Sequence, residues 1–461
     1  MKIFSRNLDY VDPEKVFLSF KNKKFFFWLD TTLTSYGRYS IIGFHPFLIF
    51  KSKKDKITIE TFNSKRKYSG NPLNYLKEIL KKYKVNSSSF FIPGAAGYLC
   101  YDTGWYIEQL PDLKPDSLKI PDIFFCFYEF FLIFDIKQKK LNLAGINIYE
   151  KEKIFKKKMD LITDEIKKNI NKKKKKEEIE IKKFSSNIKF SEYVKSIKKI
   201  KEYIKNGDVY QINFSYRFQV DGIFPSSEIY SKIRKINPAP YSAYFNFGDF
   251  EILSNSPELF IKKYKKRIIT KPMKGTGDRG RDRKEDKENY LKLLRSEKDR
   301  AELIMIVDLE RNDLGKICEY GSVKVKKLVE IEKYRTVFQT TSTIEGILKD
   351  GISPVEIIKA TFPGGSITGA PKKRAIEIIE ELEPDKRSFY TGSLGYIGFN
   401  HNMVFSILIR TILLKNNTLY YPVGGGIVWD SIPEKEYQET MTKAKNLLIT
   451  LGIENERNLF T

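Results

Sequence analysis

Strand-like runs alternate with helical patterns along the whole chain, and this alternation most limits the fold. The first 165 residues hold short runs rich in aromatic and β-branched residues, such as KFFFWLD, DKITIETF and FFCFYEFFLIFDI, together with a helical stretch, NYLKEILKKY. After residue 190 a helix over SEYVKSIKKIKEYIKNG is followed by strands, further helices, more strands and a closing helix. No unit of about 20 to 50 residues repeats, which argues against a solenoid or a propeller. The sequence therefore predicts an α+β chain.

A lysine-rich segment separates two better patterned parts of the chain. The run KKNINKKKKKEEIEIKK spans residues 167–183 and is typical of a solvated linker or an exposed helix. The 461 residues are 41% hydrophobic and 14% aromatic, which is enough to fill a large core. We expect an N-terminal region over residues 1–165, a linker over 166–184 and a larger C-terminal domain over 185–461.

The net charge and the cysteines limit the partners and the compartment. The formal net charge is +25, but the excess of lysine is diffuse and no nucleic-acid-binding signature accompanies it, so we expect no nucleic-acid partner. No apolar run reaches the roughly 18 residues of a membrane span, and no signal-type stretch opens the chain. Three widely spaced cysteines without a CxxC pair fit a reducing compartment. We expect a cytoplasmic protein without a membrane partner.

Two pairs of acidic residues stand at helical spacing. Asp299 and Glu302 lie three residues apart in SEKDRAELIMIVDLERNDLG, and Glu436 and Glu439 repeat that spacing, with Lys443 four residues further along the same face. Two such faces that meet offer oxygen ligands to one hard cation, which suits Mg²⁺ with retained waters. Acidic pairs of this kind are more often solvated surface, so both interpretations stay open at this point.

Two glycine-rich turns and one arginine indicate an anion-binding pocket. FPGGSITGAPKKRAIEIIEEL places a glycine turn directly before a helix, so backbone N–H groups of residues 366–370 are candidates to hold an anion. VGGGIV, at residues 423–428, is a second place where backbone can approach a ligand. Arg410 interrupts the apolar strand FSILIRTILL, and such a guanidinium needs a partner. A substrate carboxylate and a structural salt bridge are both open.

Seven motifs, taken in order, carry a resemblance to a known family. They are DVYQINFSYRF, SNSPELF, KPMKGTGDRGR, SEKDRAELIMIVDLERNDLG, FPGGSITGAPKKRA, GSLGYIGF and VGGGIVWDSIPEKEYQET. In this order and spacing the chain resembles the chorismate-utilising enzymes, densely over about residues 185–455. GRYSIIGFHPF and GAAGYLCYDTG extend the resemblance weakly into the N-terminal region that anthranilate synthase component I and aminodeoxychorismate synthase component I share.

The resemblance implies a fold and a set of site residues. The family fold is a two-layered α/β sandwich of two antiparallel sheets with flanking helices and the active site between them, so residues 185–461 would form the chorismate-binding catalytic domain. Glu302 and Glu439 would contact Mg²⁺, with Asp299 and Glu436 beside them, and the metal would hold the ring carboxylate of chorismate. Glu258 would be the general acid and base. The residues implied in substrate binding are Gln211, Thr276, Tyr396, Arg410, Lys443 and the backbone of Gly425 and Gly426.

Three residues favour one branch of this family. Lys274, in KPMKGT, matches the nucleophilic lysine of aminodeoxychorismate synthases, where anthranilate synthases carry alanine. Gln211 stands where the water-using isochorismate and salicylate synthases place a lysine, and Gln339 stands where anthranilate synthases have a histidine. The resemblance therefore implies a Mg²⁺-dependent amino-group transferase, aminodeoxychorismate synthase component I, on the route to p-aminobenzoate and folate. Anthranilate synthase component I is the alternative.

The resemblance also implies partners. The substrates would be chorismate and ammonia, which a glutamine amidotransferase subunit would release from glutamine. Such a glutaminase needs a reactive cysteine with a histidine base, and the only histidines, His45 and His401, lie in segments without that context. We therefore expect the glutaminase to be a separate subunit in a heterodimer.

Overall fold

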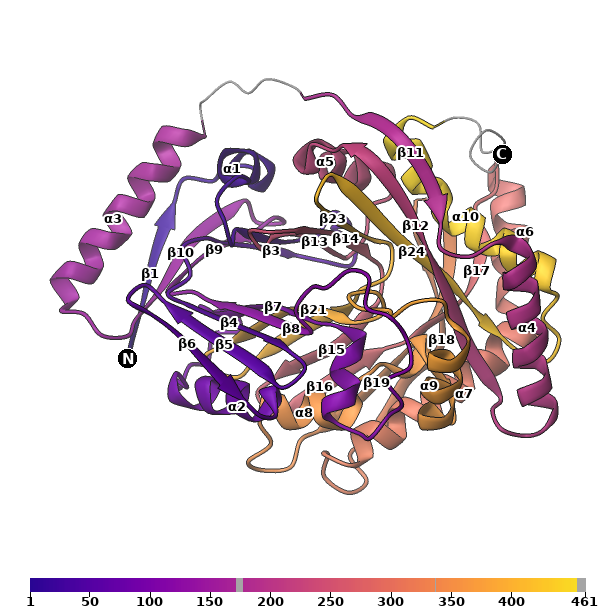
Figure 1. The fold of residues 1–461 in the computed structure, drawn as a ribbon. Coiled ribbons are helices and arrows are strands. Elements are labelled where there is room, and N and C mark those ends of the chain that lie inside the picture. The colour runs from indigo at the N-terminus through magenta and orange to yellow at the C-terminus, as the bar shows by residue number, and fades with distance from the viewer. Residues whose placement is uncertain (171–176, 336, 454–461) are drawn as a thin grey trace.

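The computed structural model describes residues 1–170, 177–335 and 337–453, and its framework is two large sheets that lie face to face (Figure 1). Within the described chain, every strand pairing is antiparallel. In order across the first sheet stand β1 (Lys2–Leu8), β10 (Lys140–Asn147), β9 (Phe130–Asp135), β3 (Tyr39–Gly43), β2 (Phe27–Asp30), β13 (Tyr241–Asn246), β14 (Glu251–Ser256), β23 (Thr411–Lys415), β24 (Thr418–Ile427), β12 (Gln211–Ile223) and β11 (Glu180–Ser186), with β20 (Gly369–Ala370) paired to β12.

The second sheet lies below the first in Figure 1 and has the same number of strands. In order stand β17 (Met273–Asp278), β19 (Val337–Ile347), β16 (Arg267–Lys271), β15 (Leu259–Tyr264), β22 (Met403–Ile407), β21 (Ser393–Gly398), β7 (Gly94–Leu99), β8 (Ile123–Phe127), β4 (Leu48–Lys53), β5 (Lys56–Thr61) and β6 (Ser64–Ser69), with β18 (Lys324–Lys333) paired to β19. The predicted α+β sandwich of two antiparallel sheets is confirmed.

Helices cover the outer faces of both sheets (Figure 1). Those on the side of the first sheet are α1 (Pro13–Phe20), α3 (Glu152–Asn169), α4 (Phe190–Lys205), α5 (Ser226–Ile236) and α10 (Pro433–Leu451). Those on the side of the second sheet are α2 (Pro72–Lys82), α6 (Arg283–Leu294), α7 (Glu297–Gly315) and α8 (Pro354–Thr361), together with the short 3₁₀ segments η1 (Tyr101–Tyr106) and η2 (Gly365–Ile367). Helix α9 (Lys372–Leu382) packs against β12 and β20 of the first sheet. Among the described residues, no helix is long and apolar enough to cross a membrane.

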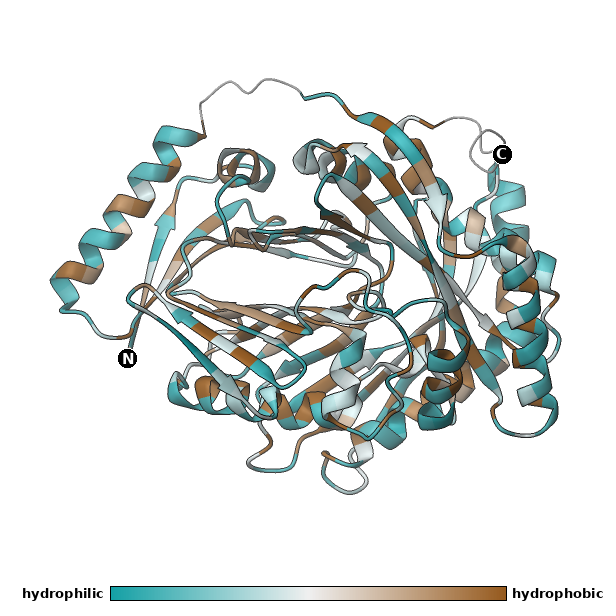
Figure 2. Ribbon diagram, in the orientation of Figure 1, coloured by the Kyte–Doolittle hydropathy of each residue, from teal (hydrophilic) through white to brown (hydrophobic). Residues whose placement is uncertain are grey.

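Strand β13 shows why these sequences form buried strands. Its side chains alternate between faces: Tyr244 packs into the core under the helices, whereas Ala243 and Phe245 pack into the core between the sheets. A strand buried on both faces carries apolar residues at consecutive positions, which explains the long aromatic runs of the sequence. Figure 2 shows the complementary pattern on the outer helix α3, where hydrophilic and hydrophobic turns alternate.

The predicted division of the chain does not correspond to separate packing units. Strand β2, from the N-terminal region, pairs with β13, and β7 pairs with β21, so each sheet takes strands from both sides of the lysine-rich segment. The predicted linker over 166–184 is also too long, because α3 continues to Asn169 and β11 begins at Glu180. Its central residues, 171–176, lie outside the described part of the chain.

Candidate active site

A cavity of about 410 Å³ opens where the edges of both sheets meet α7 and α10. Strand β24 forms its wall on the side of the first sheet, and β17 and β19 form the wall on the side of the second. Most of the predicted site residues line it: Glu258, Lys274, Thr276, Asp299, Glu302, Arg410, Gly426, Glu436, Glu439 and Lys443. The structure therefore gathers residues separated by more than a hundred positions into one polar pocket.

A bulge in β17 places Lys274 in the pocket. Pairing of β17 with β19 shifts register between Lys274 and Thr276, and Gly275 between them has a φ of +66°. A Cβ at Gly275 would lie 2.8 Å from the Thr340 hydroxyl oxygen, so this turn requires glycine for both its backbone and its space. The bulge interrupts the regular alternation of the strand at this point. Gln339, on β19, donates to the Thr276 hydroxyl at 2.6 Å and so holds the Thr276 side chain in place.

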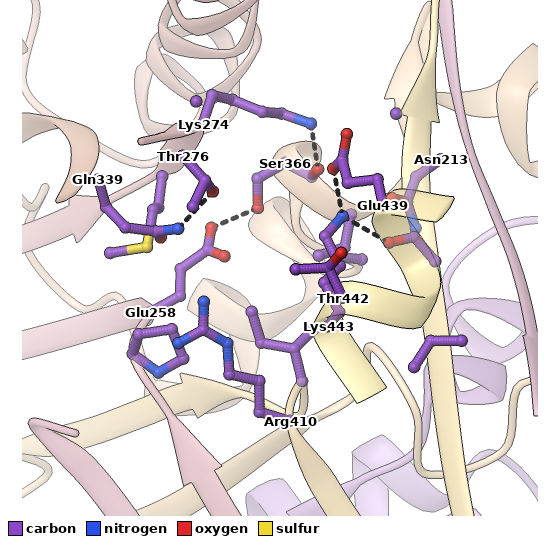
Figure 3. Close-up of a pocket in the computed structure, with 18 of the residues that line it drawn as sticks. Asn213, Glu258, Lys274, Thr276, Gln339, Ser366, Arg410, Glu439, Thr442 and Lys443 are labelled. Carbon is purple, nitrogen blue, oxygen red and sulfur yellow. Dashed lines mark hydrogen bonds and ion pairs between the residues drawn. The ribbon is translucent and has the colours of Figure 1, made fainter. Parts of the chain in front are cut away.

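Lys274 and Glu258 meet at a single residue, Ser366 (Figure 3). The Lys274 Nζ donates to the Ser366 carbonyl at 2.9 Å, and the Ser366 hydroxyl donates to Glu258 Oε1 at 2.5 Å. Glu258 follows β14, is buried, and has an N–H that donates to the Ser256 hydroxyl at 3.3 Å. An amine and a carboxyl group thus face the same space from two different strands.

Burial moves the pKa of both groups toward their neutral forms. It raises the pKa of Glu258 to about 7, although the Ser366 hydroxyl and the Lys274 ammonium oppose the shift. It lowers the pKa of Lys274, against the attraction of the Glu302 and Glu258 carboxylates. Burial therefore favours a carboxylic acid and a neutral amine in the same pocket, which is the combination that acid–base and nucleophilic chemistry needs.

Both acidic pairs face the pocket. Helix α7 begins after the N-cap Ser296 and presents Asp299 and Glu302, and α10 presents Glu436 and Glu439. Burial raises the pKa of Glu302, and the Asp299 and Glu436 carboxylates raise it further. Burial likewise raises the pKa of Glu436, with a further contribution from Glu439. This mutual repulsion indicates a place for positive charge.

The acidic pairs already have some partners. Lys443 pairs with Glu439 at 2.8 Å and lowers its pKa, Gln211 donates to Glu302 at 3.3 Å, and Ser431 donates to Glu436 at 2.7 Å. Among the described residues, no group of three or more acidic, histidine or cysteine side chains is arranged to hold a metal ion by itself. Mg²⁺ ordinarily uses one or two carboxylates and keeps several waters, so this all-oxygen donor set fits it.

Arg410 supplies a free cation to the pocket. It lies between β22 and β23 with a φ of +51°, and Figure 3 shows it entering from the side opposite Lys274. Within the described chain its guanidinium forms no ion pair or hydrogen bond, and burial lowers its pKa. A structural salt bridge, the alternative that the sequence left open, is absent here. The planar guanidinium is therefore free to hold a carboxylate in two hydrogen bonds.

The glycine run in β24 keeps the wall of the pocket flat. A Cβ at Gly426 would lie 2.2 Å from the Gln211 side-chain nitrogen, and one at Gly425 would lie 3.7 Å from Glu436 and 3.8 Å from Lys443. Lys443 also donates to the Gly424 carbonyl at 2.8 Å. Gln211 and Gly425 therefore border the pocket even though neither lines its cavity.

One expectation from the sequence is wrong. Tyr396 does not reach the pocket: its ring packs in the core between the sheets beside Phe91 and Phe131, and its hydroxyl donates to the Phe90 carbonyl. Its position on β21 points it into this core. At residues 366–370, the Ser366 carbonyl accepts from Lys274, and β20 pairs with β12. That the N–H groups of this segment hold an anion stays a prediction.

Sequence reasoning also missed several lining residues. Tyr390, Tyr421, Lys298 and Thr442 line the cavity, and no local motif pointed to them. Ser366 stood inside a glycine-rich turn that did attract attention, but its contacts with Lys274 and Glu258 are long-range. Only the tertiary structure could show them.

Comparison with known proteins agrees with this geometry. A family model described as chorismate binding enzyme matches residues 24–449. The chain is 37% identical over 439 residues to aminodeoxychorismate synthase component 1 of Bacillus subtilis (strain 168), covering 91% of this chain and 90% of the relative. It is 35% identical over 462 residues to anthranilate synthase component 1 of Acetivibrio thermocellus, covering 95% and 92%. The crystal structure of anthranilate synthase component I from Streptococcus pneumoniae TIGR4 matches with a TM-score of 0.81 at 32% identity, covering 89% of this chain and 92% of that one.

Proposed function

Because the chain belongs to the family of chorismate binding enzymes, we propose that it is the component of an aminodeoxychorismate synthase that aminates chorismate. The observation that carries the proposal is the meeting of the Lys274 amine and the Glu258 carboxyl group at Ser366 in one pocket. The reaction would convert chorismate and ammonia into 4-amino-4-deoxychorismate and water, as an amino-group transfer on the route to p-aminobenzoate and folate. Similar identities to both amine-using branches leave the choice between them to the site residues.

Lys274 is the proposed nucleophile. Its neutral amine adds to C2 of the ring while the ring double bonds shift and the C4 hydroxyl leaves. Glu258 gives that hydroxyl its proton, so it departs as water. Ammonia then adds at C4, the double bonds shift back, and the C2–nitrogen bond to Lys274 breaks. The Lys274 nitrogen keeps its two protons throughout and leaves as a neutral amine, and the proton that the added ammonia loses restores the Glu258 carboxylic acid for the next turnover.

Binding and orientation fall to the other charged residues. The free Arg410 guanidinium suits the enolpyruvyl carboxylate, with Lys443 and the glycine backbone of β24 on the same side of the pocket. Glu302 and Glu439 would hold Mg²⁺, with Asp299 and Glu436 beside them. When bound, the metal would neutralise and orient the ring carboxylate of chorismate. Gln211 keeps Glu302 in place and offers no base that could activate water.

Changing Arg410 to glutamine is expected to weaken chorismate binding. Losing a charge-assisted pair to a carboxylate costs about 1.5–3 kcal/mol, so KM should rise roughly 10-fold to 150-fold with a smaller change in kcat. Steady-state kinetics at saturating ammonium measures both constants. Arg267→Gln is the matched control, because Arg267 pairs with Glu345 on the surface of β16, and its KM should stay that of the wild type. An unchanged KM for Arg410→Gln contradicts the assignment.

Changing Glu302 to glutamine is expected to raise the Mg²⁺ concentration that gives half-maximal activity by at least about 10-fold, because a charged oxygen ligand is lost. Titrating Mg²⁺ after chelation measures this, and calorimetry of Mg²⁺ binding gives a readout without turnover. Glu297→Gln, at the exposed start of the same helix, should leave the Mg²⁺ requirement unchanged. Equal Mg²⁺ requirements in the two variants would remove Glu302 from the metal site.

A separate glutamine amidotransferase subunit is the proposed source of ammonia. Two relatives of this chain are named as component 1 of their synthases, which supports a second component.

The decisive experiment supplies purified chain with chorismate, Mg²⁺ and ammonium, and follows products by mass and fluorescence. Aminodeoxychorismate without pyruvate supports the proposal. Direct formation of anthranilate with pyruvate would instead assign the chain to the anthranilate synthase branch.

A further inference from the structure

Glu310 is a buried acidic residue to which the proposed mechanism gives no role. It lies on α7 about two turns beyond Glu302, is only 8% exposed, and does not line the pocket that holds Lys274. Among the described residues it forms no ion pair, and Lys372, the cation with the largest effect on its pKa, pairs with Asp313 instead. A buried carboxyl group without an ion pair is costly unless a hydrogen bond compensates it, so its hydrogen-bond partner is informative.

The strand that follows Glu258 is irregular at its first residues. Strand β15 shifts register directly after Leu259 in its pairing with both β16 and β22, so Phe260 is skipped in both ladders. The Phe260 carbonyl accepts instead from the Thr270 hydroxyl, at 2.7 Å. A side chain of β16 therefore holds the backbone two residues after Glu258.

Glu310 is the second partner of that hydroxyl. The Thr270 hydroxyl oxygen lies 2.7 Å from the Phe260 carbonyl oxygen and also 2.7 Å from Glu310 Oε2. A hydroxyl has one proton to donate, and a carbonyl oxygen can only accept. If Thr270 donates to Phe260, the contact with Glu310 is a hydrogen bond only when Glu310 carries the proton. The geometry therefore favours a carboxylic acid that donates to Thr270.

The surroundings of Glu310 favour the same protonation state. Burial raises the pKa of Glu310 to about 8, and the Glu258 and Asp313 carboxylates raise it further. The Thr270 hydroxyl and the Lys372 ammonium group oppose the shift. Near neutral pH the group is therefore mostly a carboxylic acid.

Glu310 also packs behind the turn that carries Ser366. A Cβ at Gly365 would lie 3.5 Å from Glu310 Cγ, so this side chain lies against the residue before Ser366. The Ser366 hydroxyl in turn donates to Glu258 at 2.5 Å. We propose that Glu310 is a positioning residue for the general acid: through Thr270 and Gly365 it holds Glu258 and Ser366 in their hydrogen bond. This inference rests on the proposed function, since it assigns Glu310 to the proton transfer that Glu258 would perform.

Two substitutions of Glu310 separate its hydrogen bond from its bulk. Glu310→Leu removes the donor and should lower kcat by about 10-fold to 10²-fold, because a small displacement of a catalytic group is costly, with KM within about 2-fold of wild type. Glu310→Gln keeps a neutral donor of the same shape, so its kcat should stay within about 2-fold of wild type. Steady-state kinetics with ammonium measures both constants.

The pH profile of kcat distinguishes positioning from a loss of stability. In Glu310→Leu the Ser366 hydroxyl should bond Glu258 less well, and this raises the pKa of Glu258 because that bond favours the carboxylate. The alkaline limb should therefore move to higher pH in Glu310→Leu and stay in place in Glu310→Gln. A loss of stability alone would lower the amount of active enzyme without moving this limb.

Changing Thr270 to valine breaks the same connection from its other end. Thr270→Val should reproduce the lower kcat and the shifted limb, and the double variant should be no slower than either single one. Thr270→Val also keeps the test valid if Glu310→Leu folds poorly. A wild-type kcat and pH profile in Glu310→Leu overturns the proposal, and so does a loss in Glu310→Gln as large as that in Glu310→Leu.

Infrared spectroscopy tests the protonation of Glu310 without turnover. Near neutral pH the wild type should show a C=O stretch of a protonated carboxyl group that is missing from the spectrum of Glu310→Gln, and identical spectra overturn the proposal. Rates of all variants are followed as loss of chorismate. A product other than aminodeoxychorismate would then refute the proposed function without affecting the assignment of Glu310.

Discussion

Replacing Lys274 with alanine is expected to lower the rate of chorismate amination on the order of 10³-fold or more, because the proposed nucleophile is removed. Burial lowers the pKa of Lys274, which favours the neutral amine, and among the described residues no other lysine donates to the Ser366 carbonyl. Any remaining turnover should yield anthranilate or no amine product. Product analysis by mass and fluorescence, with ammonium as the nitrogen source, measures the loss.

Two further variants separate nucleophilic from structural effects. Lys274→Arg keeps the positive charge but lacks an amine that can form the bond, so its activity should be as low as that of Lys274→Ala. Lys324→Ala, on the exposed edge of β18, should behave as wild type. Intact mass spectrometry without ammonia should show a chorismate-derived adduct on wild type and none on Lys274→Ala. Wild-type product formation by Lys274→Ala would refute the covalent route.

Replacing Glu258 with glutamine is expected to reduce kcat by about 10²-fold to 10⁴-fold, the usual contribution of a general acid. The wild-type rate should fall as pH rises through about 7, because Glu258 has a pKa of about 7 and loses the proton that the leaving hydroxyl needs. The rate should also fall toward low pH, because Lys274 then becomes an ammonium group. A pH profile of kcat measures both limbs.

The Glu258 variant should lack the alkaline limb of that profile. Ser366→Ala should retain it but shift it to higher pH, because the Ser366 hydroxyl donates to Glu258 and lowers its pKa. Glu251→Gln is the control: Glu251 is a half-buried carboxylate whose pKa burial also raises, it is bound to Tyr244 away from the pocket, and its loss should leave the profile unchanged. An alkaline limb that persists in Glu258→Gln would assign it to another group.

The sequence by itself determined the family, the class of fold and most of the pocket. Seven ordered motifs predicted a chorismate-utilising enzyme, and this prediction is confirmed by the family model and the relatives. Asp299 with Glu302, and Glu436 with Glu439, could be placed on common helical faces because the period of a helix is a local property. Their roles, and those of Lys274 and Glu258, stay predictions.

Other features depend on contacts between distant parts of the chain. Tyr396 was expected in the pocket from its motif. Its side chain lies on the face of β21 that packs into the core between the sheets, and this packing decides its position. The boundary placed at the lysine-rich segment failed because strand partners are chosen by the fit of whole faces, as when Leu29 pairs with Ala243.

The decisive geometry of the pocket was also beyond local sequence patterns. Ser366 links Lys274 and Glu258 across 92 and 108 residues of sequence, through a backbone carbonyl in one case and a side-chain hydroxyl in the other. A motif can identify the amine and the carboxyl group, but it carries no information about the distance between them. Only packing of the two sheets brings both groups to Ser366, and burial in that packed pocket is what shifts their pKa values.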